Sequence, residues 1–290
     1  MNDLLTHIQT IQPSALTVAV LVLATVALVV HEPISGRRSF ARFVAQEAAE
    51  GEAARIRFYR SWTVQGCVTA LLAIALVLVL PGVGLADIGF RAPDLAGVDR
   101  FGITGGSVST STIAGMITGV LLVVVMMVVA SRVRARREEA RGATTTKAPA
   151  EPRGQMKAIL PMLPRSGAGR RGWAMLSLSA GVTEEITYRG LLLLTLAVAL
   201  PSTTPRVALV IAAAVLFGLA HWYQGWTGIV STALVGGVMA SLYLSTGSLL
   251  VPMILHTLFD LRVLLLPLPR GAKAPAPAAE TVTAAPTTSA

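Results

Sequence analysis

Seven long apolar stretches constrain the fold of this chain more than any other feature. A helix needs roughly 20 apolar residues to cross the hydrocarbon core of a bilayer, and hydrophobic residues make up 53% of the 290 positions. Charged residues make up only 13%, too few for a water-facing surface. We therefore expect an all-α fold, a polytopic integral membrane bundle of about seven transmembrane helices. The stretches cover residues 14–30, 63–85, 113–130, 173–200, 206–222, 227–246 and 248–266.

The distribution of Lys and Arg predicts the orientation of the chain in the cell membrane. No such residue precedes the first stretch, whereas six lie in residues 31–62, two in residues 87–112 and eleven in residues 131–172. Because basic loops remain on the cytoplasmic side, we expect the N-terminus outside and the C-terminus in the cytoplasm. The bases flank apolar runs and have few aromatic neighbours, so the net charge of +9 indicates lipid as a partner and no nucleic acid.

Composition divides the chain into four parts. We expect residues 1–130 to form an N-terminal segment of three membrane helices and residues 173–266 to form a unit of four. Between them, residues 131–172 are basic and rich in Gly, Pro and Thr, which predicts a cytoplasmic linker that buries little apolar area. The repetition of Ala, Pro and Thr in residues 267–290 predicts a disordered tail.

Three ionisable residues stand inside the fourth apolar stretch, where charge is costly. A charged side chain at a helix centre costs about 2.5–3.5 kcal/mol on insertion scales, so such residues are usually functional. Glu185 and Arg189 are four residues apart and share a helix face, which favours a supporting ion pair. Glu184 lies about 100° around the axis, in line with Tyr188. Glu184 is therefore the better candidate for proton transfer.

Two histidines and an aspartate add to this charged set. His221 ends the fifth stretch and, taken alone, is also consistent with an interfacial histidine at a helix end. His256 and Asp260 are four residues apart in the seventh stretch, and a histidine and a carboxylate on one membrane helix favour function. Packing of three helices could bring Glu184, His221, His256 and Asp260 into one cavity.

The order of these motifs resembles a known family. EEITYRG at residues 184–190, FGLAH at 217–221 and HTLFD at 256–260 are similar to the EExxxRG, FxxxH and HxxxD or HxxxN motifs of the CPBP family of intramembrane proteases. This family includes the type II CAAX prenyl endopeptidases. The resemblance covers residues 173–266 and implies a membrane endopeptidase that cleaves a membrane-associated protein or peptide.

The resemblance also implies roles for individual residues. Glu184 would act as general base on a water molecule with His221 as its partner, whereas His256 and Asp260 would stabilise the oxyanion. Glu185 and Arg189 would support them. The prenyl proteases carry Asn at the position of Asp260, and a carboxyl group donates a hydrogen bond only when it is protonated. Alternatively, Asp260 orients His256.

Three other hypotheses remain open at this level. His221, His256 and a carboxylate from Glu184 or Asp260 would suit zinc with an open water position. We expect no cofactor, because no HExxH-type pair places two ligands on one helix. The chain could instead be a catalytically idle family member that serves as a scaffold or immunity protein. Intramembrane Glu, His and Asp also form the proton relays of transporters.

Overall fold

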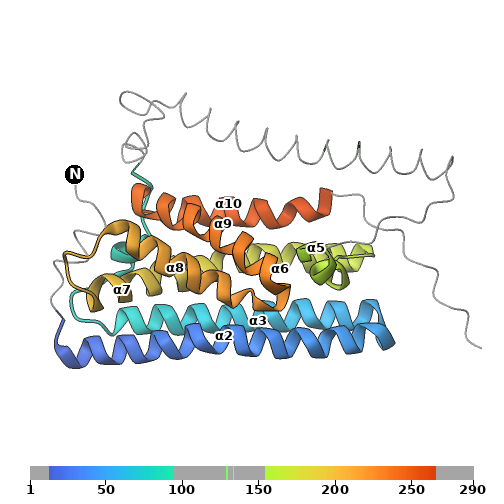
Figure 1. Ribbon diagram of the computed structural model, residues 1–290, viewed down its shortest axis with the longest axis horizontal. Coiled ribbons are helices and arrows are strands. Elements are labelled where there is room, and N and C mark those ends of the chain that lie inside the picture. The colour runs from blue at the N-terminus through green and yellow to red at the C-terminus, as the bar shows by residue number, and fades with distance from the viewer. Residues whose placement is uncertain (1–12, 95–128, 130–132, 134–153, 266–290) are drawn as a thin grey trace, which may run out of the picture.

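The computed structural model describes residues 13–94, 129, 133 and 154–265. Within these residues the regular structure is entirely helical (Figure 1), as predicted. The predicted third helix at 113–130 lies almost wholly outside the described residues, as do most of the linker and the tail at 267–290.

The N-terminal half forms one long helical hairpin. Helix α2 covers Ala15–Glu50 and α3 covers Glu52–Leu78, and the two lie side by side along the long axis of the molecule (Figure 1). Gly51 alone separates them and adopts a φ of 57°, which glycine accepts without steric cost. Residues 31–62, expected to form a basic loop, are therefore helical. The hydropathy pattern marks where apolar residues stop, but the Ala, Arg and Glu residues that follow are good helix formers.

The second half contributes a continuous helix and three shorter ones. Helix α6 continues through a π-helical segment into α7, and together they contain the predicted stretch at 173–200. Helix α6 packs against both α3 and α10, and α8 packs against α9. The bounds are Gly167–Glu185 for α6, Ile186–Leu192 for the π segment, Leu193–Ala199 for α7, Arg206–Ala220 for α8, Gly225–Thr246 for α9 and Leu250–Leu261 for α10.

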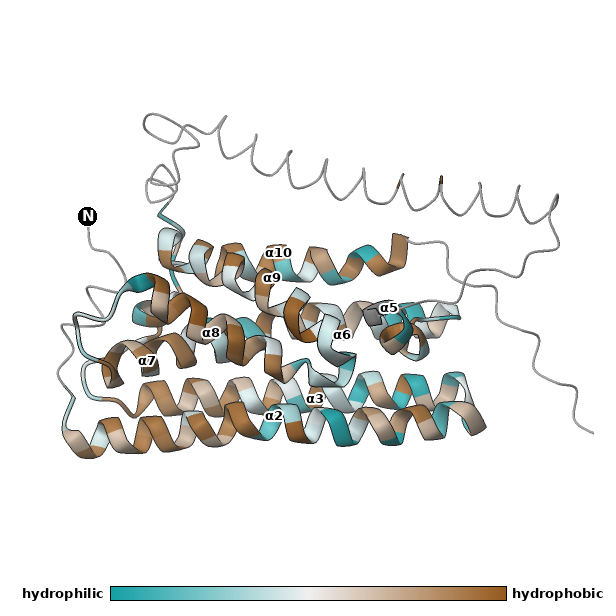
Figure 2. Ribbon diagram, in the orientation of Figure 1, coloured by the Kyte–Doolittle hydropathy of each residue, from teal (hydrophilic) through white to brown (hydrophobic). Residues whose placement is uncertain are grey.

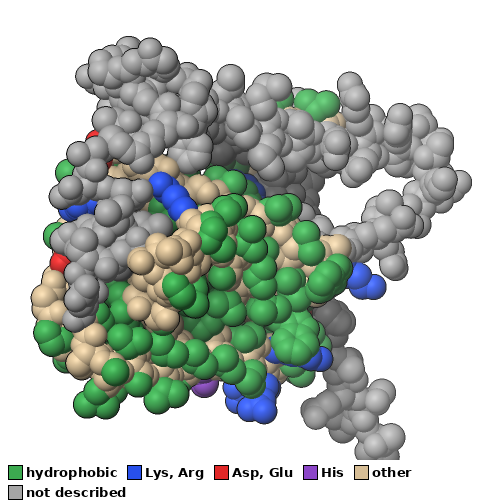
Figure 3. Space-filling model, turned by 60° about the vertical axis from the view of Figure 1, so that its left-hand side comes forward, with side chains coloured by type: hydrophobic (Ala, Val, Ile, Leu, Met, Phe, Trp, Pro, Cys, Tyr) green, Lys and Arg blue, Asp and Glu red, His purple; other side chains and the backbone are tan. Residues whose placement is uncertain are grey.

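The surface of the bundle is that of a membrane protein. Apolar residues predominate toward the end occupied by α7 and α8, and hydrophilic residues gather toward α5 (Gly154–Ile159) (Figure 2). Val207, Ile211 and Val215 lie one turn apart on α8 and are between 49% and 63% exposed, and this end of the molecule shows mainly hydrophobic side chains (Figure 3). Three described segments are long and apolar enough to cross a bilayer, namely Ala15–Glu50, Glu52–Leu78 and Trp222–Thr246. The predicted count of seven is not confirmed.

The end of the predicted linker is folded rather than extended. Residues 154–162 are helical, and Met162 and Leu163 are buried beside Trp173. The expectation of an unpacked linker therefore does not hold for residues 154–172. This segment is polar in overall composition but contains a short apolar run, which packs against aromatic side chains of the hairpin, including Phe58 and Tyr59.

A buried arginine joins this segment to the hairpin. The side chain of Arg55 is 1% exposed, binds Glu47 and Glu52, and donates from Nε to the carbonyl oxygen of Pro161 at 2.9 Å. Ser166 Oγ donates to Glu52 at 2.6 Å. The N-terminus of α6 is therefore held to the tip of the α2–α3 hairpin by paired charges.

Replacement of Arg55 should destabilise the protein. In Arg55→Met, the Pro161 carbonyl loses its donor, and Glu47 and Glu52 lose the buried one of their two partners. Breaking a buried pair costs roughly 3–5 kcal/mol. We expect the thermal unfolding midpoint of the detergent-solubilised chain to fall by several degrees. Arg57→Met is the matched control, since the Arg57–Glu50 pair is exposed and surface pairs contribute about 0–1 kcal/mol. Equal midpoints for both variants would contradict this role.

Candidate active site

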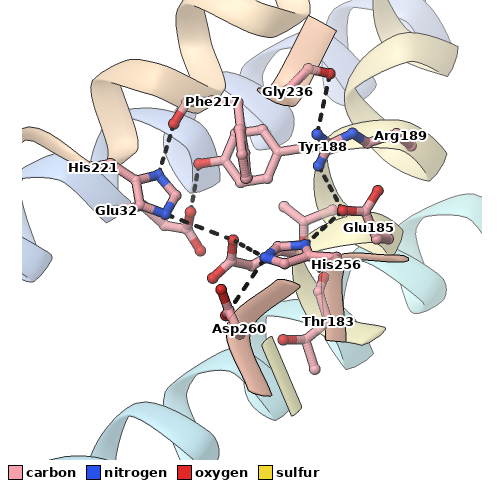
Figure 4. Close-up of polar contacts among 12 residues, drawn as sticks. Glu32, Thr183, Glu185, Tyr188, Arg189, Phe217, His221, Gly236, His256 and Asp260 are labelled. Carbon is pink, nitrogen blue, oxygen red and sulfur yellow. Dashed lines mark hydrogen bonds and ion pairs between the residues drawn. The ribbon is translucent and has the colours of Figure 1, made fainter. Parts of the chain in front are cut away.

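The four candidate residues lie close together, between α6, α10 and the residue that follows α8, and Figure 4 labels His221, His256 and Asp260 among them. Oε2 of Glu184 is 3.9 Å from Nε2 of His221 and 3.9 Å from Nε2 of His256. Oδ2 of Asp260 is 3.8 Å from the same His256 nitrogen. All four side chains line a cavity of about 170 Å³. The structure thus gathers the residues that the sequence analysis selected.

The imidazole of His221 has a defined tautomer. Its Nδ1 lies 2.9 Å from the carbonyl oxygen of Phe217, one helical turn earlier. Because a carbonyl oxygen only accepts, Nδ1 carries the proton. In the neutral ring, Nε2 therefore has a free lone pair, and this nitrogen faces Glu184. The fixed ring can accept a hydrogen bond from a water molecule held by that carboxylate.

The imidazole of His256 is oriented by Glu185. Its Nδ1 is 2.7 Å from Glu185 Oε1, and the same oxygen accepts from Arg189 NH1 at 2.9 Å. The predicted Glu185–Arg189 pair is therefore present, and both side chains are buried. Sequence spacing did not reveal that Glu185 also binds the histidine. Asp260, the alternative candidate for orienting His256, instead lies next to the free Nε2.

Arg189 is enclosed by three helices. Its NH2 donates to the carbonyl oxygen of Gly236 in α9 at 3.2 Å, and its guanidinium lies 4.3 Å from the ring centre of Phe217 in α8. The aromatic residue of FxxxH therefore has a cation–π contact with the arginine of EExxxRG. This contact explains why the two motifs, far apart in the sequence, belong to one site.

Glu184 and Glu185 stand at a change of helix geometry. Helix α6 ends at Glu185, and the next seven residues form the π segment. π-helical turns are rare and are frequent at functional sites. The change places one carboxylate in the cavity and the other against Arg189. Within the described residues, Oε2 of Glu184 is buried and has no hydrogen-bond partner. This oxygen can therefore accept a hydrogen bond from a water molecule.

A fourth carboxylate near the site, besides Glu184, Glu185 and Asp260, was not predicted from the sequence. Glu32 of α2 accepts a hydrogen bond from the hydroxyl of Tyr188, inside the EEITYRG motif (Figure 4). The expected end of the first apolar stretch at residue 30 placed Glu32 in a loop. One sequence signal could have pointed to Glu32. It is a carboxylate that directly follows an apolar run, at a place where the helix continues.

These residues do not fit a zinc site as they stand. Zinc ligands at about 2.0–2.2 Å in a tetrahedron lie roughly 3.3–3.6 Å from one another, which is shorter than the 3.8–3.9 Å separations here. Among the residues that the structure describes, no group of three or more His, Cys, Asp or Glu side chains could hold a metal ion.

Comparison with known proteins agrees with the geometry. Residues 170–262 match the family model described as type II CAAX prenyl endopeptidase Rce1-like, which confirms the resemblance to the CPBP family seen in the motifs. The match supports a CAAX-protease-like membrane endopeptidase. Neither a curated protein nor a solved structure matches the chain.

Close helix contact at Gly181 should be required for this site. A Cβ atom at Gly181 of α6 would lie 2.1 Å from Oγ1 and 2.8 Å from the backbone nitrogen of Thr257 in α10. Gly181→Ala must therefore push α10 away and separate His256 from Glu185. We expect a marked loss of thermal stability and of any activity, measured on the purified chain. Gly237→Ala is the control, since its Cβ would meet Ala214 Cβ at an ordinary 3.6 Å. Wild-type behaviour of Gly181→Ala would show that the contact is not needed.

Proposed function

We propose that this protein is an intramembrane endopeptidase in which Glu184 and His221 activate water for peptide-bond hydrolysis and His256 faces the reacting carbonyl group. One observation carries the proposal. Oε2 of Glu184 lies 3.9 Å from Nε2 of His221, a separation that a bridging water can span with hydrogen bonds to each group. A carboxylate and a neutral imidazole arranged in this way can hold and deprotonate one water molecule.

The reaction follows from the hydrogen bonds of these side chains. Glu184 takes a proton from the water as its oxygen attacks the scissile carbonyl carbon, while the lone pair of His221 Nε2 orients the water. The C–N bond then breaks, and the proton on Glu184 passes to the leaving nitrogen. Each proton taken from water is thus returned to a product.

The oxyanion of the tetrahedral intermediate would face His256 and Asp260. In its imidazolium form, His256 donates its Nε2–H to the oxyanion, and the buried carboxylate of Glu185 balances the ring charge. A donor of this kind contributes about 2.7–4 kcal/mol to catalysis in other hydrolases. Asp260 adds a second donor when it carries a proton.

The position of the site indicates a substrate cleaved near the membrane surface. Glu32 lies two residues beyond the apolar run at 14–30. Beside His221, Trp222 is half exposed and stacks under the guanidinium of Arg37 at 4.8 Å. Tryptophan and arginine gather at the boundary between lipid and water. The substrate we propose is therefore a membrane-associated protein or peptide, reached from the cytoplasmic side in the predicted orientation.

Removal of Glu184 should abolish proteolysis. We expect membranes with the wild-type chain to contain peptide fragments that disappear in Glu184→Ala, a loss of at least about 100-fold as for other general bases. Quantitative proteomics of the two membrane preparations measures the difference. Glu50→Ala, an exposed carboxylate of α2, controls for expression and loss of charge. Identical fragment patterns at equal expression would favour an idle scaffold, whereas proton flux in proteoliposomes lost with Glu184→Ala would favour a transporter.

Chelation should leave the activity intact. Hydrolysis by a carboxylate and imidazoles needs no metal ion, and the separations of 3.8–3.9 Å between Glu184 and each histidine and between His256 and Asp260 exceed those of zinc ligands. We expect the same rate of fragment formation before and after dialysis against a strong zinc chelator. Loss of activity that returns with added zinc would establish the metal alternative.

A further inference from the structure

Glu184 and His221 also line a second cavity, whose lining does not include His256. This space lies between α6 and the α2–α3 hairpin and has a volume of about 80 Å³; we call it the hairpin cavity. His256 and Asp260 line only the 170 Å³ cavity. Glu184 therefore borders two neighbouring spaces, one beside His256 and one beside the hairpin.

The hairpin cavity is lined by an unusual number of polar side chains for the interior of a membrane bundle. They are Glu32, Gln65, Thr69, Ser179, Thr183 and Thr187. The 170 Å³ cavity also has polar groups in its lining, His256 and Asp260 among them, together with large apolar residues from several helices, such as Trp173, Phe217, Met239 and Phe259. Polar groups inside a bilayer are stable when they bind one another or water.

Several of these polar groups retain the capacity to bind water. Thr187 Oγ1 donates to the carbonyl oxygen of Thr183 at 2.9 Å, and Glu32 accepts from Tyr188. A hydroxyl oxygen that donates still has lone pairs, and a carboxylate accepts up to about four hydrogen bonds. A single water needs about 10–15 Å³ of such a cavity, so the hairpin cavity has room for several.

Hydrolysis at this site requires a route by which water reaches Glu184, and the hairpin cavity offers one. A peptide in the 170 Å³ cavity, with its carbonyl at His256, fills the space on that side of Glu184. The attacking water must then reach Glu184 by another route in each catalytic cycle. The hairpin cavity also borders Glu184, and hydrogen-bonding groups form part of its walls.

We propose that the hairpin cavity is a water-binding site that supplies the attacking water to Glu184, with Glu32 as the positioning residue that orients this water. This inference rests on the proposed function. It assigns the two cavities beside Glu184 different tasks, with the peptide held beside His256 and Asp260 and the water held beside Glu32. It also gives the N-terminal hairpin, which lies outside the matched residues 170–262, a direct part in the reaction.

Thiol labelling tests the hydration of the cavity without any substrate. Thr69 and Ala73 lie one turn apart on α3 and are both buried, but only Thr69 lines the hairpin cavity. In a Cys67→Ser background, Thr69→Cys and Ala73→Cys are compared in native membranes with aminoethyl methanethiosulfonate, which reacts with the thiolate that forms in water. We expect Thr69→Cys to react at least about 10-fold faster. Equal rates at the two positions would overturn the water site.

Kinetics of Glu32 variants test its positioning role. With a substrate identified from the fragment comparison, we expect Glu32→Gln to lower kcat on the order of 10-fold with KM unchanged, since the peptide binds in the other cavity. Glu32→Asp should recover part of kcat, and Glu50→Gln, an exposed carboxylate on the same helix, should match the wild type. A rise in KM alone, or a wild-type kcat for Glu32→Gln, would refute this role.

The two proposals fail in different ways. Fast labelling of Thr69→Cys together with unchanged fragments in Glu184→Ala would retain the water site and reject the protease. Proteolysis lost in Glu184→Ala together with equal labelling at positions 69 and 73 would retain the protease and reject the water site.

Discussion

A single buried cation determines how the second half of this protein packs. The guanidinium of Arg189 is almost fully buried, and a charge in a medium of low dielectric must be paired. Its partners come from three elements, a carboxylate one turn away in α6, a carbonyl oxygen in α9 and an aromatic face in α8. The same carboxylate then binds His256 of α10. The pairing of the Arg189 charge therefore fixes the relative positions of four helices, α6, α8, α9 and α10. The candidate catalytic side chains lie on these helices or directly after them.

Much of this arrangement is predictable because helix spacing and hydropathy are local properties. The interval of four residues between Glu185 and Arg189 predicts their ion pair, and the apolar stretches from residue 206 onward predict α8, α9 and α10 within a few residues. The ordered motifs point to Glu184, His221, His256 and Asp260. Their meeting depends on tertiary packing, but each had to face the bundle interior because lipid would not accept it.

Other features depend on contacts between distant segments and leave no periodic signal. Nothing in the spacing of residues shows that Glu185 orients His256, because that bond requires α6 and α10 to approach as closely as Gly181 allows. Hydropathy likewise ends the first stretch at residue 30, whereas the helix continues to Glu50. Glu32 was therefore assigned to a loop, although it reaches Tyr188 inside the bundle.

The position of Glu32 shows that the N-terminal hairpin borders the candidate site, although the site's motifs all lie in the second half of the chain. The motifs in residues 170–262 supply the four side chains of the candidate site, but one wall of the space around Glu184 belongs to α2 and α3. Arg55 joins the outer end of that hairpin to the start of α6 through Pro161, Glu52 and Ser166. The hairpin is thus attached to the catalytic helix both at its tip and beside Glu184. Without the hairpin, Tyr188 would lose the carboxylate that accepts its hydroxyl hydrogen bond and Glu184 would lose one wall of its surroundings, so both halves contribute to the site.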